Sequence, residues 1–252
     1  MRVVSDLADL ESAWTSEYAR LARAIAALLP SEVTALVEVG CGRGQLTVSL
    51  VRNVAKAQGD VIDRFAGPYS SDREQLFERL KSAGLVDRVR VLSGDATKVL
   101  RRQPTGSLDA IVSGEFLSEL TSSSLASFFE SCHRSLRGGG VSVHAYLSPA
   151  PRNEGQRLTI EADSDPRWTN HPPAEWFSPS LETARRSITK TGFADVRVEV
   201  KRSRLRFTGL AAAAQLEGWG VRAGFYRNYE GALRKHGLEL PDWVVLRGIR
   251  RQ

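Results

Sequence analysis

The sequence predicts an α/β protein with an open, mostly parallel sheet and helices on both of its faces. Two observations lead to this fold class. Short apolar segments that indicate buried strands alternate with amphipathic segments that indicate helices. Glycine and acidic residues follow several of the strand segments, as expected where ligands bind beyond the carboxyl ends of parallel strands. We therefore look for function at the ends of the strands.

The expected elements follow one another along the chain. Residues 5–29 are helical, because apolar side chains recur at three- and four-residue steps and Pro30 stops the pattern. Gly59 and Gly84 mark the ends of the next two helices, and the glycines at 138–140 mark a turn before a strand. Further helices are expected at 45–57, 72–80, 122–136, 180–191 and 210–236, and strands at 36–39, 61–63, 88–92, 108–116, 141–147, 195–207 and 243–249.

The segment 36–47, LVEVGCGRGQLT, carries the strongest functional signal. An apolar strand pattern containing Glu38 passes into three glycines and then into a helical pattern. Gly40 lets the chain leave the strand sharply, Gly42 removes the Cβ that would block a ligand, and Gly44 lets the helix begin close to the sheet. The exposed amides at the helix start then form a donor-rich floor for a polar ligand. The alternative is a tight turn without a ligand.

This spacing, an acid followed after one residue by G-x-G-x-G, resembles the first motif of class I S-adenosylmethionine-dependent methyltransferases. It differs from the G-x-G-x-x-G of dinucleotide sites. The triplet Gly94-Asp95-Ala96 is similar to the family's third motif, and Leu136 to Gly140 is similar to the turn before its fifth strand, here without the usual proline. The resemblance covers 35–148 by motif and 180–250 by pattern. It implies a seven-stranded, doubly wound sheet ending in an antiparallel pair, methyltransferase activity, and S-adenosylmethionine as cofactor.

The resemblance also implies which residues bind the cofactor. Asp95 corresponds to the acid that faces the adenine amino group, and it also suits a helix cap. The complete set of candidates is Glu38, Gly40, Cys41, Gly42, Gly44, Asp63, Asp95, Ala96, Ser113 and Gly114.

Asp63 is the first candidate for the ribose. It ends the short apolar run of the second strand, and a carboxylate suits the two hydroxyls of a cis-diol. Its separation from Gly44 is close to the roughly 20 residues expected for this contact. In an alternative register the strand continues through Phe65, which places Tyr69 at the ribose.

Glu115 and Glu119 are the candidate catalytic residues. They follow the strand at 108–116, and if 115–119 form a turn of helix, both carboxylates lie on one face. Such a pocket would hold a guanidinium or amine and take its proton as the methyl arrives. The paired acids loosely resemble those of protein arginine methyltransferases, whose acids lie farther apart. Alternatively, Glu115 places the methionine amine of the cofactor and Glu119 opens the next helix. His144 is expected in the core.

We expect one domain, 1–252, with three additions to the sheet. Residues 1–30 form a helical cover, in which Tyr18 is a candidate ligand contact although the aromatic side chains there are chiefly expected in the core. Residues 149–179, rich in Pro and containing His171 and Trp176, are too long for a simple connection and read as a lid, or else as a surface excursion. Residues 208–240 form a helical insertion before the last strand.

Composition leaves the acceptor open. The formal net charge is +6 and only six of the 35 basic residues are lysine, which suits acidic partners or RNA, or else reflects an arginine-rich, archaeal or thermophilic type of protein. Lys201, Arg202, Arg204 and Arg206 are the best nucleic-acid candidates. We expect a nitrogen on a protein or peptide as acceptor, with a small molecule or RNA as alternatives; a binding-only homologue and a nicotinamide-dependent oxidoreductase are the alternatives of another class.

Two cysteines and the absence of metal-ligand spacing predict neither disulfides nor a metal site. The sequence contains no apolar run of about 20 residues and no apolar core of a signal peptide near its start, so we expect a cytoplasmic protein.

Overall fold

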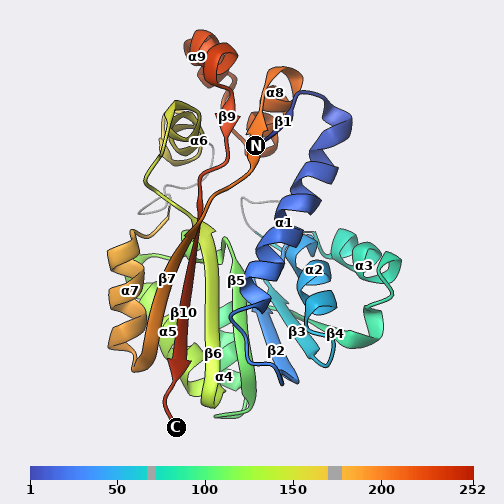
Figure 1. The fold of residues 1–252 in the computed structure, drawn as a ribbon, viewed down its shortest axis with the longest axis vertical. Helices are drawn as coiled ribbons and strands as arrows, with labels where there is room; N and C mark the ends of the chain where they lie inside the picture. The colour runs from blue at the N-terminus through green and yellow to red at the C-terminus, as the bar shows by residue number, and fades with distance from the viewer. Residues whose placement is uncertain (67–71, 170–177) are drawn as a thin grey trace.

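The computed structural model describes residues 1–66, 72–169 and 178–252. Its main sheet has seven strands in the order β4-β3-β2-β5-β6-β10-β7 (Figure 1). The first five of these pair in parallel, and β10 runs antiparallel to both β6 and β7. The predicted seven-stranded sheet with an antiparallel pair at one edge is confirmed. The strands are β2 (Ala35–Val39), β3 (Gln58–Asp63), β4 (Val89–Ser93), β5 (Leu108–Gly114), β6 (Leu136–Leu147), β7 (Phe193–Lys201) and β10 (Trp243–Arg250).

Helices cover both faces of this sheet because its central strands are apolar on both sides. On β5, Ala110 and Val112 pack into one core cluster, and Ile111 packs into the other. One face carries α1 (Leu10–Ala26), α2 (Gln45–Asn53) and α3 (Arg73–Ser82), and the other carries α4 (Ala96–Arg102), α5 (Ser122–Ser135) and α7 (Leu181–Lys190). Short 3-10 helices lie at Leu7–Asp9 (η1), Val86–Arg88 (η2) and Phe116–Glu119 (η3).

A second layer lies beyond the carboxyl ends of the parallel strands, at the top of Figure 1. Its three-stranded sheet has the order β1-β8-β9, with strands β1 (Arg2–Val4), β8 (Leu205–Phe207) and β9 (Leu238–Glu239). The helices α6 (Glu154–Ser164), α8 (Gly209–Gly218) and α9 (Ala223–His236) pack around it. We call this sheet and these three helices the cap. The described parts of the three segments expected as additions contribute to it or pack against it, and residues 170–177 of the expected lid lie outside the described residues.

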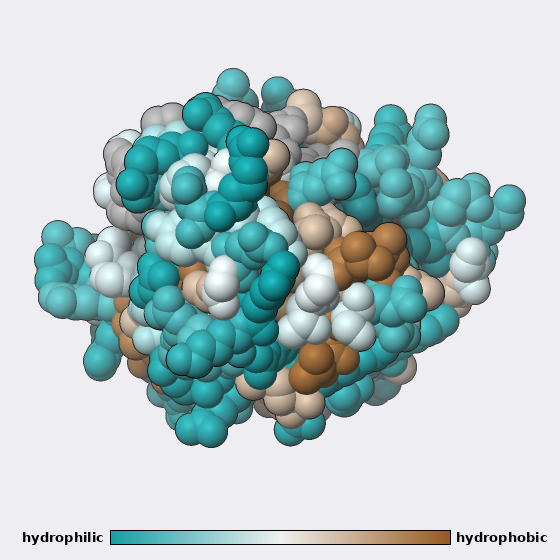
Figure 2. Space-filling model, turned by 90° about the horizontal axis from the view of Figure 1, so that it is seen from above, coloured by the Kyte–Doolittle hydropathy of each residue, from teal (hydrophilic) through white to brown (hydrophobic). Residues whose placement is uncertain are grey.

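The outer face of the cap is mainly hydrophilic, with a band of apolar side chains beside its centre (Figure 2). Val3, Leu7 and Leu210 are exposed apolar residues of β1, η1 and α8. Among the residues that the structure describes, no helix is both long and apolar enough to cross a membrane.

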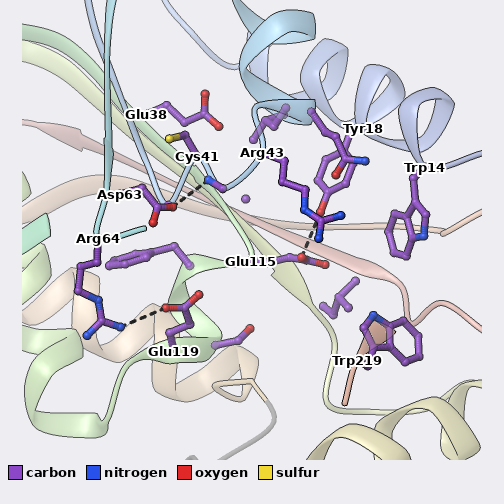
Figure 3. Close-up of a pocket in the computed structure, with 18 of the residues that line it drawn as sticks. Trp14, Tyr18, Glu38, Cys41, Arg43, Asp63, Arg64, Glu115, Glu119 and Trp219 are labelled. Atoms are coloured by element: carbon purple, nitrogen blue, oxygen red, sulfur yellow. Dashed lines mark hydrogen bonds and ion pairs between the residues drawn. The ribbon is translucent and has the colours of Figure 1, made fainter. Parts of the chain in front are cut away.

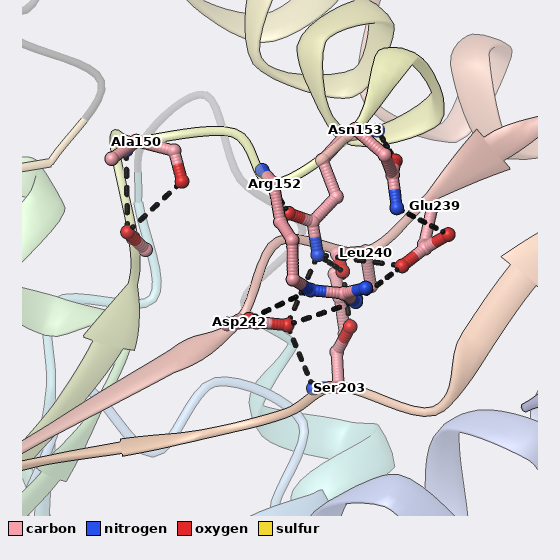
Figure 4. Close-up of polar contacts among 9 residues, drawn as sticks. Ala150, Arg152, Asn153, Ser203, Glu239, Leu240 and Asp242 are labelled. Atoms are coloured by element: carbon pink, nitrogen blue, oxygen red, sulfur yellow. Dashed lines mark hydrogen bonds and ion pairs between the residues drawn. The ribbon is translucent and has the colours of Figure 1, made fainter.

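Three of the crossings between the main sheet and the cap meet in one polar cluster (Figure 4). Arg152, which follows β6, donates to Asp242 and Glu239, which flank the start of β10. Ser203, between β7 and β8, donates its backbone amide to Asp242 at 3.2 Å. Gln156 Nε2 donates to Asp242 Oδ1 at 3.0 Å. We call these five residues the polar joint, since they tie all three crossings together.

Several expected boundaries were wrong. The strand predicted at 195–207 is two strands in different sheets, because the chain leaves the main sheet after Lys201 and enters the cap at Leu205. The helix from Gln45 ends at Asn53, so Gly59 lies inside β3 instead of ending that helix. The glycines at 138–140 lie inside β6, where the register against β5 shifts. The short β1 was not predicted.

Candidate active site

A cavity of about 590 Å³ lies between the carboxyl ends of the main strands and the cap. Its lining comes from the β2–α2 turn, the ends of β3 and β5, the β4–α4 turn, and the helices α1, α6 and α8. This volume is typical of pockets that enclose small molecules and cofactors. The place agrees with the general location of ligand sites in open α/β sheets.

The glycine turn at 40–44 forms the floor of the cavity. Gly42 has φ of +51°, and a Cβ built on it would meet no atom within 4 Å, so the space above it is open to a ligand. Gly44, the N-cap of α2, has φ of +81°, and a Cβ there would stand 2.5 Å from Leu76 Cδ1. Gly42 therefore leaves room for a ligand, whereas Gly44 leaves room for the packing of α3 against α2.

Asp63 ends β3 beside this turn (Figure 3). Its Oδ2 accepts a hydrogen bond from the Gly42 amide and its Oδ1 accepts one from the Phe65 amide, both at 2.8 Å. Each carboxylate oxygen keeps a second lone pair that is available to a ligand. Phe65 lies outside β3 with φ of +50°, so the alternative register through Phe65 is wrong. Tyr69, the ribose candidate of that register, lies outside the described residues.

Asp95 and Ala96 line the cavity at the start of α4. Asp95 Oδ1 accepts from the Lys98 amide at 2.9 Å, so the expected capping role is confirmed. The other carboxylate oxygen has no such bond to the helix start and leaves an acceptor on the cavity side.

Glu38 is buried under the glycine turn, and both of its carboxylate oxygens lack a hydrogen-bond partner among the described residues. The Thr47 hydroxyl lies nearby without hydrogen-bond geometry and is also unpartnered. Burial raises the pKa of Glu38 to about 7, the nearby Thr47 hydroxyl lowers it, and the charge of Asp63 raises it further. Burial also raises the pKa of the neighbouring Cys41 thiol far above its ordinary value. A buried carboxyl without a partner that faces a cavity suits a ligand with a cationic or donor group.

Ser113 is not among the described residues that line the cavity, and its cofactor contact stays a prediction. Its hydroxyl lies 2.8 Å from His144 Nδ1, and Ser142 Oγ lies 2.6 Å from the other ring nitrogen. Burial lowers the pKa of His144 to about 3, which agrees with the expected core histidine. Side chains alternate along β5, so Ser113 faces α5 while Gly114 reaches the cavity.

Glu115 and Glu119 both line the cavity but have different partners. Glu115 Oε2 accepts from the Tyr18 hydroxyl at 3.1 Å, whereas Glu119 lies 3.6 Å from Arg64 Nη2 (Figure 3). The predicted helical turn exists, but it is the 3-10 helix η3, with Glu115 as its N-cap at φ of +64°. Four residues rotate by about 120° in a 3-10 helix and by about 40° in an α-helix, so the two carboxylates diverge.

The two carboxyl groups also differ electrostatically. Burial raises the pKa of Glu115 to about 7; the hydrogen bond from Tyr18 lowers it, and the charges of Asp163 and Glu119 raise it. Burial also raises the pKa of Glu119, the charge of Asp63 adds to this, and Arg64 opposes it. Glu119 therefore belongs to the end of the cavity that holds Asp63, and Glu115 belongs to the other end.

Aromatic side chains surround the Glu115 end. Trp14 and Tyr18 come from α1, with ring centroids 5.8 Å apart, and Trp219 follows α8. Trp14 Nε1 donates to Gln215 of α8 at 2.8 Å, which joins the two helices. Sequence reasoning named Tyr18 and missed the two tryptophans. Their positions on apolar helix faces signal burial, and no local signal shows that one cavity receives both.

The charge of the cavity lining is strongly negative in a protein of net charge +6. Its described lining residues include two arginines, Arg43 and Arg64. They also include seven acids, namely Glu11, Glu38, Asp63, Asp95, Glu115, Glu119 and Asp163. This balance favours ligands that carry positive charge.

Comparisons with known proteins agree with this site. Residues 36–140 match the family model described as "Methyltransferase domain". Over these residues the chain is similar to a methyltransferase domain. The matched residues hold the glycine turn, Asp63, Asp95 and Glu115. No curated protein sequence matches the chain.

Solved structures of low sequence identity share the fold of this chain. The Bacillus subtilis protein YcgJ superposes with a TM-score of 0.65 at 13% identity, over 94% of this chain and 99% of that protein. A SAM-dependent methyltransferase from Archaeoglobus fulgidus gives 0.58 at 17% identity, over 94% of both chains. Phosphoethanolamine N-methyltransferase 2 of Haemonchus contortus, in complex with S-adenosyl-L-methionine, gives 0.60 at 14% identity, over 92% of this chain and 53% of that protein. The chain spans little more than half the length of several such proteins.

The cavity has features that suit S-adenosylmethionine. The open space above Gly42 would let the cofactor approach the protein backbone closely. The free lone pairs of Asp63 suit the ribose hydroxyls, and the unpartnered Glu38 carboxyl suits a cationic group.

Proposed function

We propose that the protein is an S-adenosylmethionine-dependent methyltransferase and that it methylates the nitrogen of a small organic amine that binds beside Glu115. The observation that carries this proposal is the Glu115 carboxyl, which is buried at the aromatic end of the cavity and has a pKa of about 7. A general base near the operating pH is what an amine acceptor requires, because a protonated amine has no lone pair to attack with.

The residues of this chain have separate roles in the reaction. S-adenosylmethionine, when bound, supplies a methyl group on a positively charged sulfur. The lone pair of the amine nitrogen forms the new N–C bond as the C–S bond breaks. The electron pair of the broken C–S bond leaves with sulfur, which gives S-adenosylhomocysteine. Glu115 takes the proton that the nitrogen loses, and Tyr18 holds the Glu115 carboxylate in place. Alignment of the two reactants can contribute roughly 7 to 11 kcal/mol to lowering the barrier.

The remaining acids are proposed to act on the cofactor. Asp63 accepts from the ribose hydroxyls, Asp95 accepts from the adenine amino group, and Glu38 lies beneath the glycine turn where it can meet a cationic group. Glu119, which the sequence paired with Glu115, instead holds Arg64 beside Asp63.

A small acceptor is favoured over a protein or peptide nitrogen because α1, α6 and α8 cover the cavity, which must hold the cofactor as well. The RNA alternative has less support. The basic cluster at 201–206 is divided between two sheets, and none of its members is among the described residues lining the cavity. Lys201 also pairs with Glu199 at 2.5 Å.

Glu115→Gln tests the proposal, with Glu11→Gln as the matched control. Glu11 also lines the cavity, but it lies at an exposed position and pairs with Arg79. We expect Glu115→Gln to lower kcat by about 10²- to 10⁴-fold with little change in the dissociation constant of S-adenosylhomocysteine. The control should retain its rate. Wild-type turnover in Glu115→Gln, or a weakened cofactor with normal kcat, would place Glu115 on the cofactor and refute the base.

A further inference from the structure

We infer that Arg43 binds the carboxylate at the amino-acid end of S-adenosylmethionine. This inference rests on the proposed function, which supplies the cofactor and places its ribose at Asp63 and its adenine at Asp95. It depends on three features of the cavity: the order of the strand ends beneath it, the direction of the Arg43 side chain, and the excess of acids in the described lining.

The strand ends beneath the cavity set the direction in which the cofactor lies. Asp95 follows β4, Asp63 ends β3, the glycine turn follows β2, and Glu115 follows β5. These strands are neighbours in the order β4-β3-β2-β5, and the three steps between them cover roughly 14 Å. In S-adenosylmethionine the ribose lies between the adenine and the sulfur, and the sulfur carries the amino-acid end. With the adenine at Asp95 and the ribose at Asp63, the amino-acid end therefore lies over the glycine turn, toward Glu115.

Arg43 belongs to this end of the cavity. It is part of the glycine turn and lines the cavity. Its side chain extends toward Glu115 and away from Asp63 (Figure 3). The other arginine of the described lining, Arg64, lies at the ribose end, where it pairs with Glu119. Of these two arginines, Arg43 is therefore the one on the side where the carboxylate is expected.

A carboxylate that enters this cavity needs a positive partner. Acids outnumber arginines by seven to two among the described lining residues, so an unpaired carboxylate would be repelled. A guanidinium has five N–H donors in a planar fork, which fits a carboxylate with two parallel hydrogen bonds. Arg43 already has an interaction of its own, and this number of donors lets it hold a ligand as well. A carboxylate paired in this way would repel the nearby Glu115 less.

Two ligands that differ only in the carboxylate test the inference. The whole chain is titrated calorimetrically with S-adenosylhomocysteine and with its decarboxylated analogue, S-adenosyl-3-thiopropylamine, which keeps the amine. The wild type should bind S-adenosylhomocysteine about 10- to 100-fold more tightly than the analogue, as expected for hydrogen bonds between charged groups. Arg43→Met should weaken the binding of S-adenosylhomocysteine by the same factor and bind the analogue as the wild type does.

Three further variants identify the group that is responsible. Arg43→Lys keeps the charge without the planar fork and should lose less affinity for S-adenosylhomocysteine than Arg43→Met. Arg52→Met, at an exposed position in the last turn of α2 and outside the described lining, is the matched control and should bind both ligands as the wild type does. Arg64→Met should change the affinities for both ligands by the same factor, because Arg64 lies at the ribose end.

The outcomes separate this inference from the proposed function. If Arg43→Met weakens both ligands equally, Arg43 acts through the shape of the glycine turn, and the inference is wrong while the proposed function stands. A preference for S-adenosylhomocysteine that persists in Arg43→Met, or that disappears in Arg64→Met instead, also overturns the inference. Failure of the wild type to bind S-adenosylhomocysteine would refute the cofactor of the proposed function, and the inference with it. The predicted ligand preferences without methylation of any amine would refute the proposed acceptor alone.

Discussion

Replacing Gly42 by alanine separates the cofactor role of the glycine turn from its role in folding. Gly42 has φ of +51° and its new Cβ would meet no protein atom within 4 Å, so folding bears only the left-handed backbone cost of about 1–2 kcal/mol. The added methyl stands where the cofactor approaches the backbone. Overpacking at such a contact costs about 1–3 kcal/mol, which corresponds to roughly 5- to 150-fold weaker binding of S-adenosylhomocysteine.

Two other glycines serve as matched comparisons. Gly84, after α3, has φ of +67° and equally open space around a built Cβ, but it does not line the cavity. Gly84→Ala should therefore lose the same stability as Gly42→Ala and bind the cofactor normally. Gly44→Ala should be the most destabilised, by about 2–5 kcal/mol, since its Cβ would also collide with buried Leu76 at 2.5 Å.

Urea unfolding measures the stability of the three variants, and calorimetric titration with S-adenosylhomocysteine measures their affinity. We expect Gly84→Ala and Gly42→Ala to lose the same stability, and Gly44→Ala to lose more. We expect Gly42→Ala to lose affinity for S-adenosylhomocysteine and Gly84→Ala to keep it. Wild-type affinity in Gly42→Ala would show that the cofactor does not approach this part of the turn.

Three further predictions concern buried polar groups. Because the pKa of Glu38 is raised to about 7, its contribution to stability is complete below about pH 4.3 and is lost as pH rises through 7, by up to about 3 kcal/mol. Glu38→Gln should flatten this decline of stability with pH, measured by urea unfolding. An unchanged slope would refute the assignment. Asp242 accepts hydrogen bonds from Arg152, Gln156 and Ser203 in the polar joint. Asp242→Asn should therefore lose about 1–3 kcal/mol of stability while its cofactor affinity stays unchanged. Stability equal to that of the wild type would show that the joint is not held by this charge. Tyr18→Phe removes a hydrogen bond that lowers the pKa of Glu115, so the rising limb of kcat/KM against pH should move to higher pH, and an unmoved limb would separate Tyr18 from the base.

The parts of the site that local chemistry specifies could be predicted from sequence. Gly42 and Gly44 adopt positive φ, a conformation that favours glycine. Asp95 is the N-cap of the helix that begins at the next residue, and it accepts from the amide three residues ahead. Their positions therefore follow from short spacings. Asp63 followed in the same way from its place at the end of an apolar run.

Other features depend on geometry that short patterns do not contain. Because side chains alternate along β5, the Ser113 hydroxyl lies beside His144 while Gly114 reaches the cavity. Glu115 and Glu119 diverge because their turn is a 3-10 helix.

The acceptor end of the cavity shows the limit of sequence patterns most clearly. Trp14, Asp163 and Trp219 belong to three segments that meet only when the cap assembles. The helical segments predicted around Trp14 and Trp219 were expected to bury a face, and the segment of Asp163 was expected only as a lid or a surface excursion. Neither expectation says what the segment meets. The split of the strand at 195–207 has the same cause, since Ser203 bonds to the distant Asp242.

Calorimetric titration of the wild type, Asp63→Ala and Asp60→Ala with S-adenosylhomocysteine tests the central assignment most directly. Asp60 lies on the same strand and pairs with Arg90 away from the cavity, so it controls for the loss of an acid from β3. The cavity described above predicts one site per chain, no binding of NAD, and at least tenfold weaker binding in Asp63→Ala alone. Equal affinity of the three proteins for S-adenosylhomocysteine would contradict the placement of the cofactor between the glycine turn and Asp63.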